Sequence, residues 1–268
     1  MKSLLCINHK NEKSNLALEP VLKKLKSLSF GVSYDFAEID TCDLVITIGG
    51  DGTILKYGKA AAKARKPLLG INTGTLGFMA TLETDELDKL ERLLTKEYRT
   101  SRRMMLDINL YPLAVKNRDD NMEFVALNDV VLKRETAQLP EFRVSVGGIE
   151  VSKIRSDGLI FSTPTGSTAY ALSAGGPILE PELSCIEFTP LCPHTLFSRT
   201  MVFSGDIPIT IEFSGCPCEF IADGEGAVRV NETQTIEIKK ANYFLELIDM
   251  EKNSFYNSVY NKLMRPLK

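Results

Sequence analysis

Short hydrophobic runs and helically spaced hydrophobic residues alternate along the first hundred positions of this chain. Leu4–Ile7, Leu44–Ile48 and Pro67–Ile71 are short apolar runs, and Val32–Phe36 is a further candidate. After the first run, hydrophobic residues recur at helical spacing at Leu16, Leu18, Val21, Leu22, Leu25 and Leu28. Short apolar runs are typical of buried strands, and helical spacing is typical of a helix that covers a sheet. The pattern therefore predicts an α/β domain with a parallel sheet, whose ligands bind beyond the carboxyl ends of the strands.

Two more helices are expected in this region. The stretch Thr53–Ala64 follows an apolar run and is rich in alanine, the strongest helix former. Thr84 is expected to cap another helix, because its hydroxyl can accept a backbone N–H and because Asp85 and Glu86 complement the helix dipole. The inward face of that helix would carry Leu87, Leu90, Leu93 and Leu94.

The pattern changes to an alternation of apolar and polar residues after position 103. The alternating apolar positions include Leu106, Ile108, Leu110, Phe142, Val144, Val146, Ile207, Ile209, Ile211, Phe213, Val228, Val230, Ile236 and Ile238. A period of two is typical of half-buried strands, and the pair Gly147-Gly148 predicts a tight hairpin turn. We therefore expect an α/β domain over residues 1–100, a β-rich domain over 101–245, and a C-terminal segment, 246–268, that packs back on the first domain. Ser254–Met264 is expected to form a closing helix.

Composition and charge argue against several classes of partner. The formal net charge is −3 and no stripe of Lys or Arg stands out, so the chain is not expected to bind nucleic acid. No apolar run is long enough to cross a bilayer, and the N-terminus, MKSLLCINHK, turns polar too soon for a signal peptide. We therefore expect a cytoplasmic protein without a membrane partner.

The six cysteines are scattered, which in a cytoplasmic protein predicts reduced thiols rather than disulfides. Four of the possible zinc ligands are Cys192, His194, Cys216 and Cys218. A single proline separates the members of each pair, which is closer than the spacing of about two to four residues that zinc sites use. We expect no metal site built from protein ligands, and we expect His194 to be structural.

The turn after the Leu44–Ile48 run carries the most informative chemistry. It contains Gly49, Gly50, Asp51 and Gly52 directly before an expected helix. Glycines let a backbone approach a ligand closely, and free N–H groups at a helix N-terminus favour phosphate. An acid at the edge of an anion site needs another role, so we interpret Asp51 as a general base for a hydroxyl that attacks phosphorus. The alternative interpretation is a tight turn with an acidic helix cap.

The motif GGDGT at Gly49–Thr53 resembles the signature shared by NAD kinases, diacylglycerol kinases, sphingosine kinases and, more distantly, phosphofructokinases. Further motifs decide among these families. They are NTGTLGF at Asn72–Phe78, LNDVVL at Leu127–Leu132, SDGLIFSTPTGSTAYALSAGGP at Ser156–Pro177 and CPHTL at Cys192–Leu196. In this order they resemble the NAD kinase family along nearly the whole chain.

The resemblance implies a phosphofructokinase-like (Rossmann-like) N-terminal domain and an all-β C-terminal domain. It implies phosphorylation of the 2′-hydroxyl of the adenosine ribose of NAD by ATP, which makes NADP, with a divalent metal cation, Mg²⁺ or Mn²⁺, on the triphosphate. NAD and ATP are then the partners, and a homodimer or homotetramer is expected.

Residue chemistry and the resemblance together suggest a set of site residues. By their chemistry, Gly49 and Lys56 are expected to contact phosphate. By the resemblance, Asp51 is the proton acceptor, and Asn128 with Asp129 holds the acceptor ribose. The other residues expected to bind substrate are Gly50, Gly52, Thr53, Asn72, Phe78, Arg155, Asp157, Thr168, Ala169, Tyr170 and Ser173. An amide beside a carboxylate suits a ribose diol, although Asn128-Asp129 without the other motifs would be interpreted as a β-turn or bulge.

Two departures from the family pattern and two alternative functions stay open. Asp129 stands where many family members have Glu, and Glu225 stands where many bacterial relatives have Gln, which leaves the ligand contact of Glu225 open. A lipid or sphingoid kinase shares the GGDGT motif but needs an apolar acceptor pocket, whereas this second domain offers hydroxyls and amides. The other alternative is a non-catalytic dinucleotide-binding sensor, and the intact Asp51 argues against it.

Overall fold

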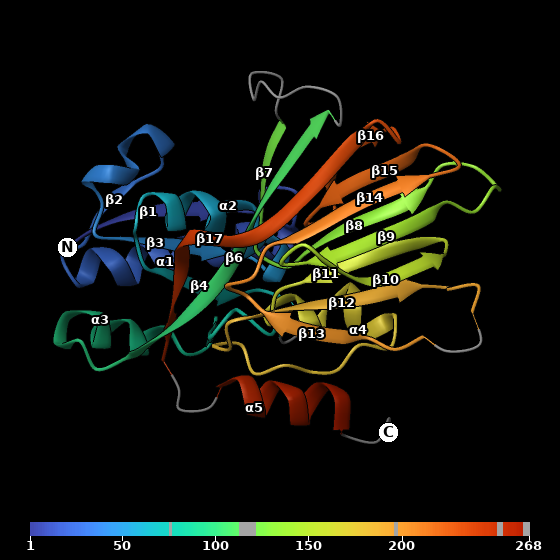
Figure 1. Cartoon of the computed structure of the whole chain (residues 1–268). Coiled ribbons are helices and arrows are strands. Elements are labelled where there is room, and N and C mark those ends of the chain that lie inside the picture. Colours follow the sequence, from blue (N-terminus) through green and yellow to red (C-terminus); the bar gives the residue numbers. More distant parts are fainter. Residues whose placement is uncertain (75–76, 113–121, 196–197, 251–253, 265–268) are drawn as a thin grey trace. The chain divides into compact units, whose positions relative to one another are not determined.

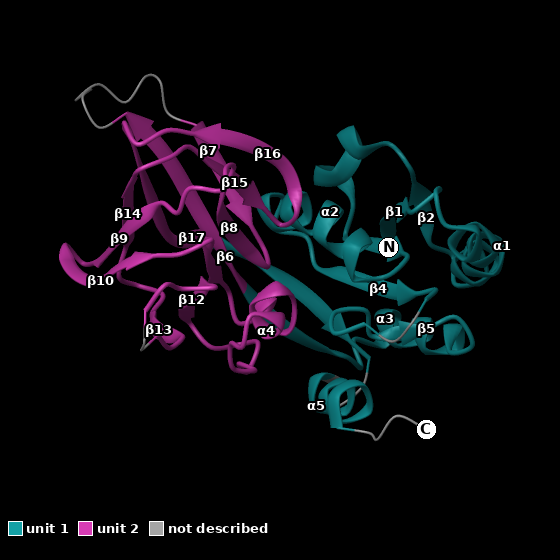
Figure 2. Ribbon diagram, turned by 90° about the vertical axis from the view of Figure 1, so that its right-hand side faces the viewer, with its two compact units in different colours: residues 1–103, 243–268 teal, residues 104–242 magenta. Residues whose placement is uncertain are grey.

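In the computed structural model, the residues described are 1–74, 77–112, 122–195, 198–250 and 254–264. They form two compact units, which are coloured separately in Figure 2. Unit 1 comprises residues 1–103 and 243–268, and unit 2 comprises residues 104–242. Two long strands, β6 (Arg99–Pro112) and β17 (Gln234–Asp249), contribute residues to both units.

Unit 1 is built on a parallel sheet, which confirms the predicted α/β class. Its strands are β1 (Lys2–Ile7), β2 (Gly31–Ser33), β3 (Leu44–Ile48), β4 (Leu68–Asn72) and β5 (Leu82–Glu83), with the end of β17. The order is β2-β1-β3-β4, and both β5 and β17 pair with β4. The chain runs from β1 outward to β2 and then resumes at β3 on the other side of β1. The topology therefore reverses between β1 and β3.

Helix α1 (Glu12–Ser27) follows β1, and helix α2 (Asp51–Lys63) follows β3 (Figure 1). Leu25 of α1 is fully buried, as predicted, whereas Leu16 is 71% exposed. Ala17 is buried instead, because it lies about two turns before Leu25 on the same face of the helix. Both predicted helices are therefore confirmed, and the buried face of α1 is corrected at one position.

The strand expected at Val32–Phe36 ends early. Strand β2 stops at Ser33, and a 3₁₀ helix, η1 (Phe36–Thr41), follows. The Asp35 carboxylate caps this helix, because it accepts the backbone N–H of Ala37 at 2.9 Å. A capping acid directly after Ser33 and Tyr34 explains why the extended backbone does not continue.

The helix predicted to start at Thr84 begins later and is shorter. A 3₁₀ helix, η2 (Leu87–Glu91), leads into a single α-helical turn, α3 (Arg92–Thr95). The residue before them is Glu86, whose carboxylate accepts the backbone N–H of Glu83 at 3.3 Å. This local hydrogen bond ties the start of the segment to β5, so the prediction that Thr84 caps the helix is wrong.

Unit 2 consists of two antiparallel sheets, which confirms the predicted all-β class. Sheet A contains, in order, β10 (Ile149–Arg155), β9 (Glu141–Val146), β14 (Ile209–Ser214), β17, β6 and β7 (Met122–Ala126). Sheet B contains, in order, β13 (Met201–Ser204), β12 (Cys185–Leu191), β11 (Gly158–Ser162), β8 (Asp129–Arg134), β15 (Cys218–Ala222) and β16 (Glu225–Val230). The predicted hairpin at Gly147-Gly148 joins β9 to β10, and both glycines have positive φ, +58° and +83°.

Apolar side chains from both sheets form the core of unit 2. Phe142 of sheet A packs there with Phe161 and Phe188 of sheet B, and all three are fully buried. Alternate residues of sheet B point to its other face, where Ile160 packs with Ala171 of the short helix α4 (Tyr170–Ser173). The segment that follows β11 therefore covers the outer face of sheet B.

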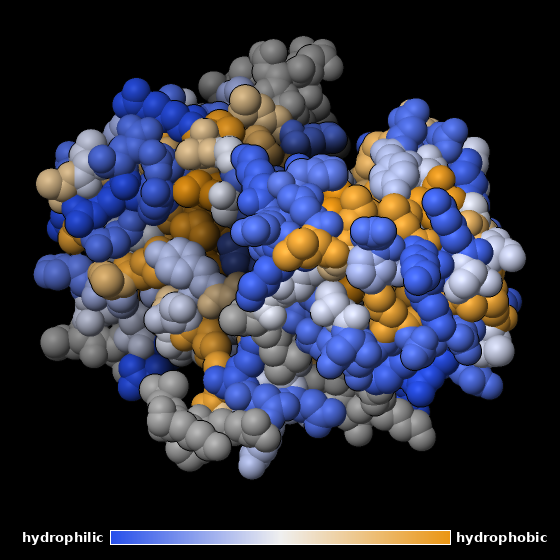
Figure 3. Space-filling view, turned by 180° about the vertical axis from the view of Figure 1, so that it is seen from behind, coloured by the Kyte–Doolittle hydropathy of each residue, from blue (hydrophilic) through white to orange (hydrophobic). Residues whose placement is uncertain are grey.

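The C-terminal helix is assigned to unit 1. It runs as α5 (Ser254–Val259) and continues as a π-helical turn, η5 (Tyr260–Met264), so the predicted closing helix is confirmed. Tyr260, at the start of the π-helical turn, is 61% exposed. Among the described residues, no helix is long and apolar enough to cross a membrane. Hydrophilic residues predominate on the face shown in Figure 3.

Candidate active site

The glycine turn of unit 1 leads from β3 into the first residues of α2, as predicted. Gly49 is required by packing, because a Cβ there would collide with the Thr53 side chain. Gly50 and Gly52 differ, since a Cβ at either position would meet no atom within 4 Å. Glycine inside a helix is less stable than alanine, and Gly52 lies within α2. Packing within the protein therefore does not explain why residues 50 and 52 are glycines, which indicates that a ligand approaches the backbone there.

Asp51 starts α2, and its carboxylate is held by the loop after β4. Oδ2 accepts the backbone N–H of Phe78 at 2.7 Å, while Oδ1 accepts those of Met79 at 3.1 Å and Ala80 at 3.4 Å. A Cβ at Gly77 would collide with Oδ1, so this loop approaches closely only because residue 77 is glycine. Asp51 is half-buried and lies outside the apolar core. A carboxylate offers about four lone-pair sites, so these three bonds leave one for another hydrogen bond.

A cavity of about 360 Å³ opens beside the start of α2 in unit 1. The residues that line it are Ile7, Asn8, His9, Lys10, Gly52, Thr53, Lys56 and Tyr57. Ile7 ends β1, and Gly52 follows β3, so the cavity lies where the topology reverses, the usual ligand position in open α/β sheets. Lys10 and Lys56 are exposed, and they add positive charge to the N-terminus of α2. This arrangement suits a chain of phosphates, and Lys10 is a residue that the motif analysis missed.

Asn72 and Phe78 of unit 1 are placed differently from each other. The Asn72 side chain is buried, and its amide donates to both oxygens of Glu83, at 2.9 and 3.2 Å. It therefore orders the loop after β4. Phe78 is half-buried, with its ring centroid 6.4 Å from that of Phe255 and 4.2 Å from the Lys262 ammonium.

In unit 2, Asn128 and Asp129 lie at the turn where the chain passes from β7 of sheet A to β8 of sheet B. The Asp223 carboxylate organises this turn, because it accepts the backbone N–H groups of Leu127, Asn128 and Asp129 at 2.7–3.3 Å. Asp223 and Gly224 have φ of +51° and +71° and join β15 to β16 in a two-residue turn. Sequence analysis missed this role of Asp223, because an Asp-Gly pair predicts a hairpin turn but does not indicate which distant N–H groups the aspartate binds. Glu225, whose ligand contact was left open, is exposed at the start of β16.

Asp129 combines burial with a negative neighbour. Its side chain is 6% exposed, and burial together with the nearby charge of Asp223 raises its pKa from 3.8 to about 7. Burial disfavours the ionised form, and a like charge acts in the same direction. Near neutral pH this carboxyl group therefore exists in both forms and can accept or donate a hydrogen bond.

Three buried polar atoms of unit 2 have no hydrogen-bond partner among the described residues. They are Oε2 of Glu187 on β12 and, at and near the Asn128 turn, Oδ1 of Asn128 and Oγ1 of Thr165. Thr165 precedes η4 (Gly166–Thr168) and was not among the predicted site residues. Nearby, Thr163 Oγ1 donates to the carbonyl of Leu127 at 2.6 Å, which joins the hydroxyl-rich segment to the Asn128 turn. Unpaired buried polar atoms are costly, so Oδ1 of Asn128 and Oγ1 of Thr165 indicate a polar ligand that satisfies them.

The other predicted residues of this segment lie further along it. Thr168 and Ala169 are half-buried, whereas Tyr170 and Ser173 of α4 are exposed. Tyr170 is 47% exposed, so it does not pack in the core as most aromatic residues do. Ala171 of this segment packs with Val131 on the outer face of sheet B, the face to which Asp129 points because it lies two residues before Val131 in β8.

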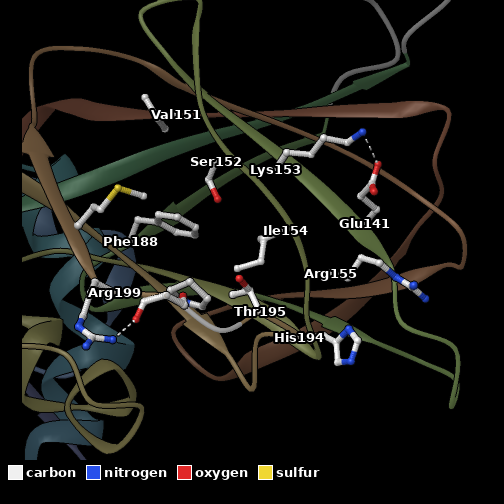
Figure 4. A pocket seen from close by; sticks show the side chains of 13 residues that line it. Glu141, Val151, Ser152, Lys153, Ile154, Arg155, Phe188, His194, Thr195 and Arg199 are labelled. Carbon is white, nitrogen blue, oxygen red and sulfur yellow. Dashed lines mark hydrogen bonds and ion pairs between the residues drawn. The ribbon is translucent and has the colours of Figure 1, made fainter.

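Arg155 and Asp157 are separated from the Asn128 turn. Ser162 pairs with Asp129 at one end of β11, and Gly158 lies at the other end, about 13 Å away for four strand residues. Asp157 forms an ion pair with Arg134 Nε at 2.9 Å. Arg155 lines a pocket of about 630 Å³ with His194 (Figure 4). Within one chain, the structure thus divides the predicted residues of unit 2 between the two ends of β11.

Comparison with known proteins identifies relatives along most of the chain. The family model of the ATP-NAD kinase N-terminal domain matches residues 8–98, and that of the ATP-NAD kinase C-terminal domain matches residues 127–250. A protein named NAD kinase from Natranaerobius thermophilus is 37% identical over 239 residues, 88% of this chain and 82% of the relative. Another from Clostridium beijerinckii is 34% identical over 277 residues, 98% of this chain and 96% of the relative.

Two solved structures share the fold. Yeast NADH kinase complexed with NADH aligns with a TM-score of 0.88 and 22% identity, over 100% of this chain and 90% of that chain. An NAD kinase from Archaeoglobus fulgidus in complex with ATP aligns with a TM-score of 0.78 and 26% identity, over 98% of this chain and 99% of that chain. Since both domain models match in order and the relatives extend over nearly the whole sequence, this chain belongs to the ATP-NAD kinase family.

Proposed function

We propose that this chain is an NAD kinase, which transfers the γ-phosphoryl group of ATP to the 2′-hydroxyl of the adenosine ribose of NAD and releases NADP and ADP. The observation that carries the proposal is the Asp51 carboxylate, which three backbone N–H groups hold while one lone pair stays available. Membership in the ATP-NAD kinase family supports the reaction. A diacylglycerol or sphingoid acceptor is not favoured, because the relatives described above are NAD kinases rather than lipid kinases.

Asp51 is proposed to act as the general base. It removes the proton of the ribose 2′-hydroxyl as that oxygen forms a bond to the γ-phosphorus. The bond between the γ-phosphorus and the bridging oxygen breaks, and ADP leaves with the electron pair. Phosphoryl transfer needs alignment and charge neutralisation more than covalent chemistry. The backbone N–H groups of residues 78–80 hold the Asp51 carboxylate. This supports the role, because backbone donors are fixed in position, whereas donors on flexible side chains are not.

The donor phosphates are proposed to bind in the 360 Å³ cavity of unit 1. Lys10 and Lys56 supply positive charge, and the backbone N–H groups at the start of α2 supply donors. Gly50 and Gly52 leave room for the phosphates, since neither position has an atom within 4 Å of a would-be Cβ. The divalent cation is proposed to be carried mainly by phosphate oxygens and water, as Mg²⁺ commonly is. Among the described residues, no group of three or more His, Cys, Asp or Glu side chains is placed to hold a metal.

The dinucleotide is proposed to bind over the outer face of sheet B in unit 2. Asn128 and Thr165 offer unpaired buried polar atoms, and Asp129 offers a carboxyl group with a pKa of about 7 to the ribose hydroxyls. Thr168, Ala169, Tyr170 and Ser173 would contact the rest of NAD from the segment above that face. A cytoplasmic location and a homodimer or homotetramer remain parts of this proposal.

The test is a direct assay of the reaction. The protein is incubated with ATP, Mg²⁺ and NAD, and NADP is detected with a dehydrogenase that uses NADP alone. Parallel reactions replace NAD with diacylglycerol or sphingosine and use ATP labelled in the γ-phosphate. We expect NADP and no labelled lipid. Labelled lipid without NADP would support the lipid kinase, and NAD binding without turnover would support the sensor.

A further inference from the structure

Strand β12 of sheet B carries a buried acid that the proposed reaction does not use. Glu187 has no exposed surface. Its neighbours in the strand, Ile186 and Phe188, point into the core of unit 2, so Glu187 points to the opposite face. That face is covered by the segment that carries α4. A fully buried Glu is rare unless it is paired, so this residue needs a specific explanation.

Glu187 lies in the same row of sheet B as Asp129. Ser162 of β11 pairs with Asp129 on one side and with Glu187 on the other. Residues opposite each other in antiparallel strands point to the same face, so the two acids flank Ser162 about 10 Å apart. Glu187 is therefore beneath the proposed dinucleotide surface, two strands from the acid that is proposed to hold the ribose.

The Glu187 carboxyl group touches the end of the α4 segment directly. A Cβ at Gly176 would collide with Glu187 Oε1, so the two groups are in contact. The Gly176 N–H donates to the carbonyl of Ala171 at 2.9 Å, which ties this contact to α4. The Glu187 carboxyl group thus contacts the backbone at Gly176, and this backbone is joined by a hydrogen bond to the helix that carries Tyr170 and Ser173.

The surroundings of Glu187 do not suit a negative charge. Thr189 Oγ1 donates to Oε1 at 2.8 Å and also lies 3.0 Å from Thr200 Oγ1, whereas Oε2 has no partner among the described residues. No cation is found to pair with Glu187 in that part of the chain. Two titratable groups in its surroundings are acids: Cys185 lies two residues away on the same strand, and Asp129 lies in the same row of sheet B. Burial raises the pKa of Glu187, and the hydrogen bond from Thr189 opposes this shift.

We propose that Glu187 is a positioning residue for NAD binding. As a neutral acid it packs beneath the segment from Tyr170 to Gly176, and when it ionises it displaces that segment. On ionisation the proton passes to solvent, and the carboxylate must gain water that the packed segment excludes. The segment then moves away from sheet B, and the affinity for NAD falls as the pH rises. The inference rests on the proposed role of Tyr170 and Ser173 in NAD binding.

The first test is the KM for NAD as a function of pH in the wild type, Glu187→Gln and Glu182→Gln. The amide in Glu187→Gln cannot ionise, while Glu182 is an exposed acid in the connection that precedes β12. The ratio of the wild-type KM for NAD to the Glu187→Gln KM should increase by roughly threefold or more between about pH 6 and about pH 9, with little change in kcat. Glu182→Gln should follow the wild type. A constant ratio of the wild-type and Glu187→Gln KM values would overturn the proposal.

The second test measures the segment itself without catalysis. Backbone hydrogen exchange of peptides that cover residues 168–178 is compared between wild type and Glu187→Gln at the same pH. Exchange should be equal near pH 6 and faster in the wild type near pH 9, because only the wild type can ionise there. Equal exchange at both pH values would overturn the proposal. If Glu187→Gln does not fold, Glu187→Met provides an uncharged side chain of similar length for the same comparison.

These tests separate the positioning role from the proposed reaction. If the wild type forms no NADP, the proposed function fails, and the exchange measurement still decides whether Glu187 controls the segment. If the wild type forms NADP but its KM and exchange do not differ from those of Glu187→Gln as described, the reaction stands and the positioning role fails.

Discussion

The Asp51 carboxylate accepts a hydrogen bond of 2.7 Å from the backbone N–H of Phe78. The two residues come from different connections of the parallel sheet, Asp51 from the turn after β3 and Phe78 from the loop after β4. The same carboxylate therefore orders a loop and is also the proposed general base. Variants of Asp51 must be interpreted with both roles in mind.

Asp51→Asn should lower kcat by about a hundredfold to ten-thousandfold, because an amide cannot accept the proton of the ribose hydroxyl. The dissociation constant for NAD should change little. Stopped assays of NADP formation and calorimetric titration with NAD measure the two quantities. Near-normal turnover would remove Asp51 from the chemistry.

The structural role of Asp51 predicts a second effect of the same variant. An amide nitrogen replaces one acceptor oxygen, so one backbone N–H in residues 78–80 loses its partner, and the free energy of unfolding should fall by about 1 to 3 kcal/mol. Asp85→Asn, at an exposed position, is the matched control and should change neither stability nor kcat. Urea denaturation checks both variants.

The glycines of the turn should respond in opposite ways to alanine. Gly52→Ala should stabilise the protein by about 0.5 to 1 kcal/mol, since the residue is helical and its Cβ meets no atom. The same Cβ would enter the space proposed for the phosphates, so the KM for ATP should rise. Gly49→Ala should destabilise the protein, because its Cβ collides with Thr53. Melting temperatures and KM values test the pair, and an unchanged KM for ATP in a stabilised Gly52→Ala would argue against a donor site here.

Lys10→Ala and Lys56→Ala should each raise the KM for ATP by about tenfold or more while leaving the KM for NAD nearly unchanged. A charge-assisted hydrogen bond to phosphate contributes roughly 1.5 to 3 kcal/mol, which corresponds to that change. Lys63→Ala is the control, because Lys63 is exposed in the last turn of the same helix and does not line the cavity. Equal effects of all three variants would indicate a general charge effect instead.

Asp129 should make stability depend on pH in a defined window. Its pKa is 3.8 when unperturbed and about 7 in the folded protein. Between these values the folded state keeps a proton that the unfolded state has lost, so the free energy of unfolding falls as the pH rises. The slope approaches about 1.4 kcal/mol per pH unit within the window and disappears below and above it.

The measurement is urea denaturation of the wild type and Asp129→Asn between about pH 4 and about pH 8. The difference in free energy of unfolding between the two proteins should change across this range and level off at its upper end. A difference that is independent of pH would mean that Asp129 ionises normally in the folded protein.

Much of the fold follows from local patterns. The apolar runs at Leu4–Ile7, Leu44–Ile48 and Pro67–Ile71 became β1, β3 and β4, because burial on both faces of a parallel sheet leaves few alternatives for such runs. Where prediction failed, a local hydrogen bond decided. The carboxylates of Asp35 and Glu86 formed bonds to nearby N–H groups, which the hydrophobic pattern does not report.

By itself, the sequence determined the two classes of domain, the glycine turn with its acid, and the family, because each depends on residues that are close together in the chain. The tertiary structure alone decided which distant groups meet. Asp223 reaches the N–H groups of residues 127–129, and Glu187 lies in one row with Asp129, because strand order and register set these partners. Strand pairing depends on contacts summed over the whole sheet, and no short stretch of sequence contains that information.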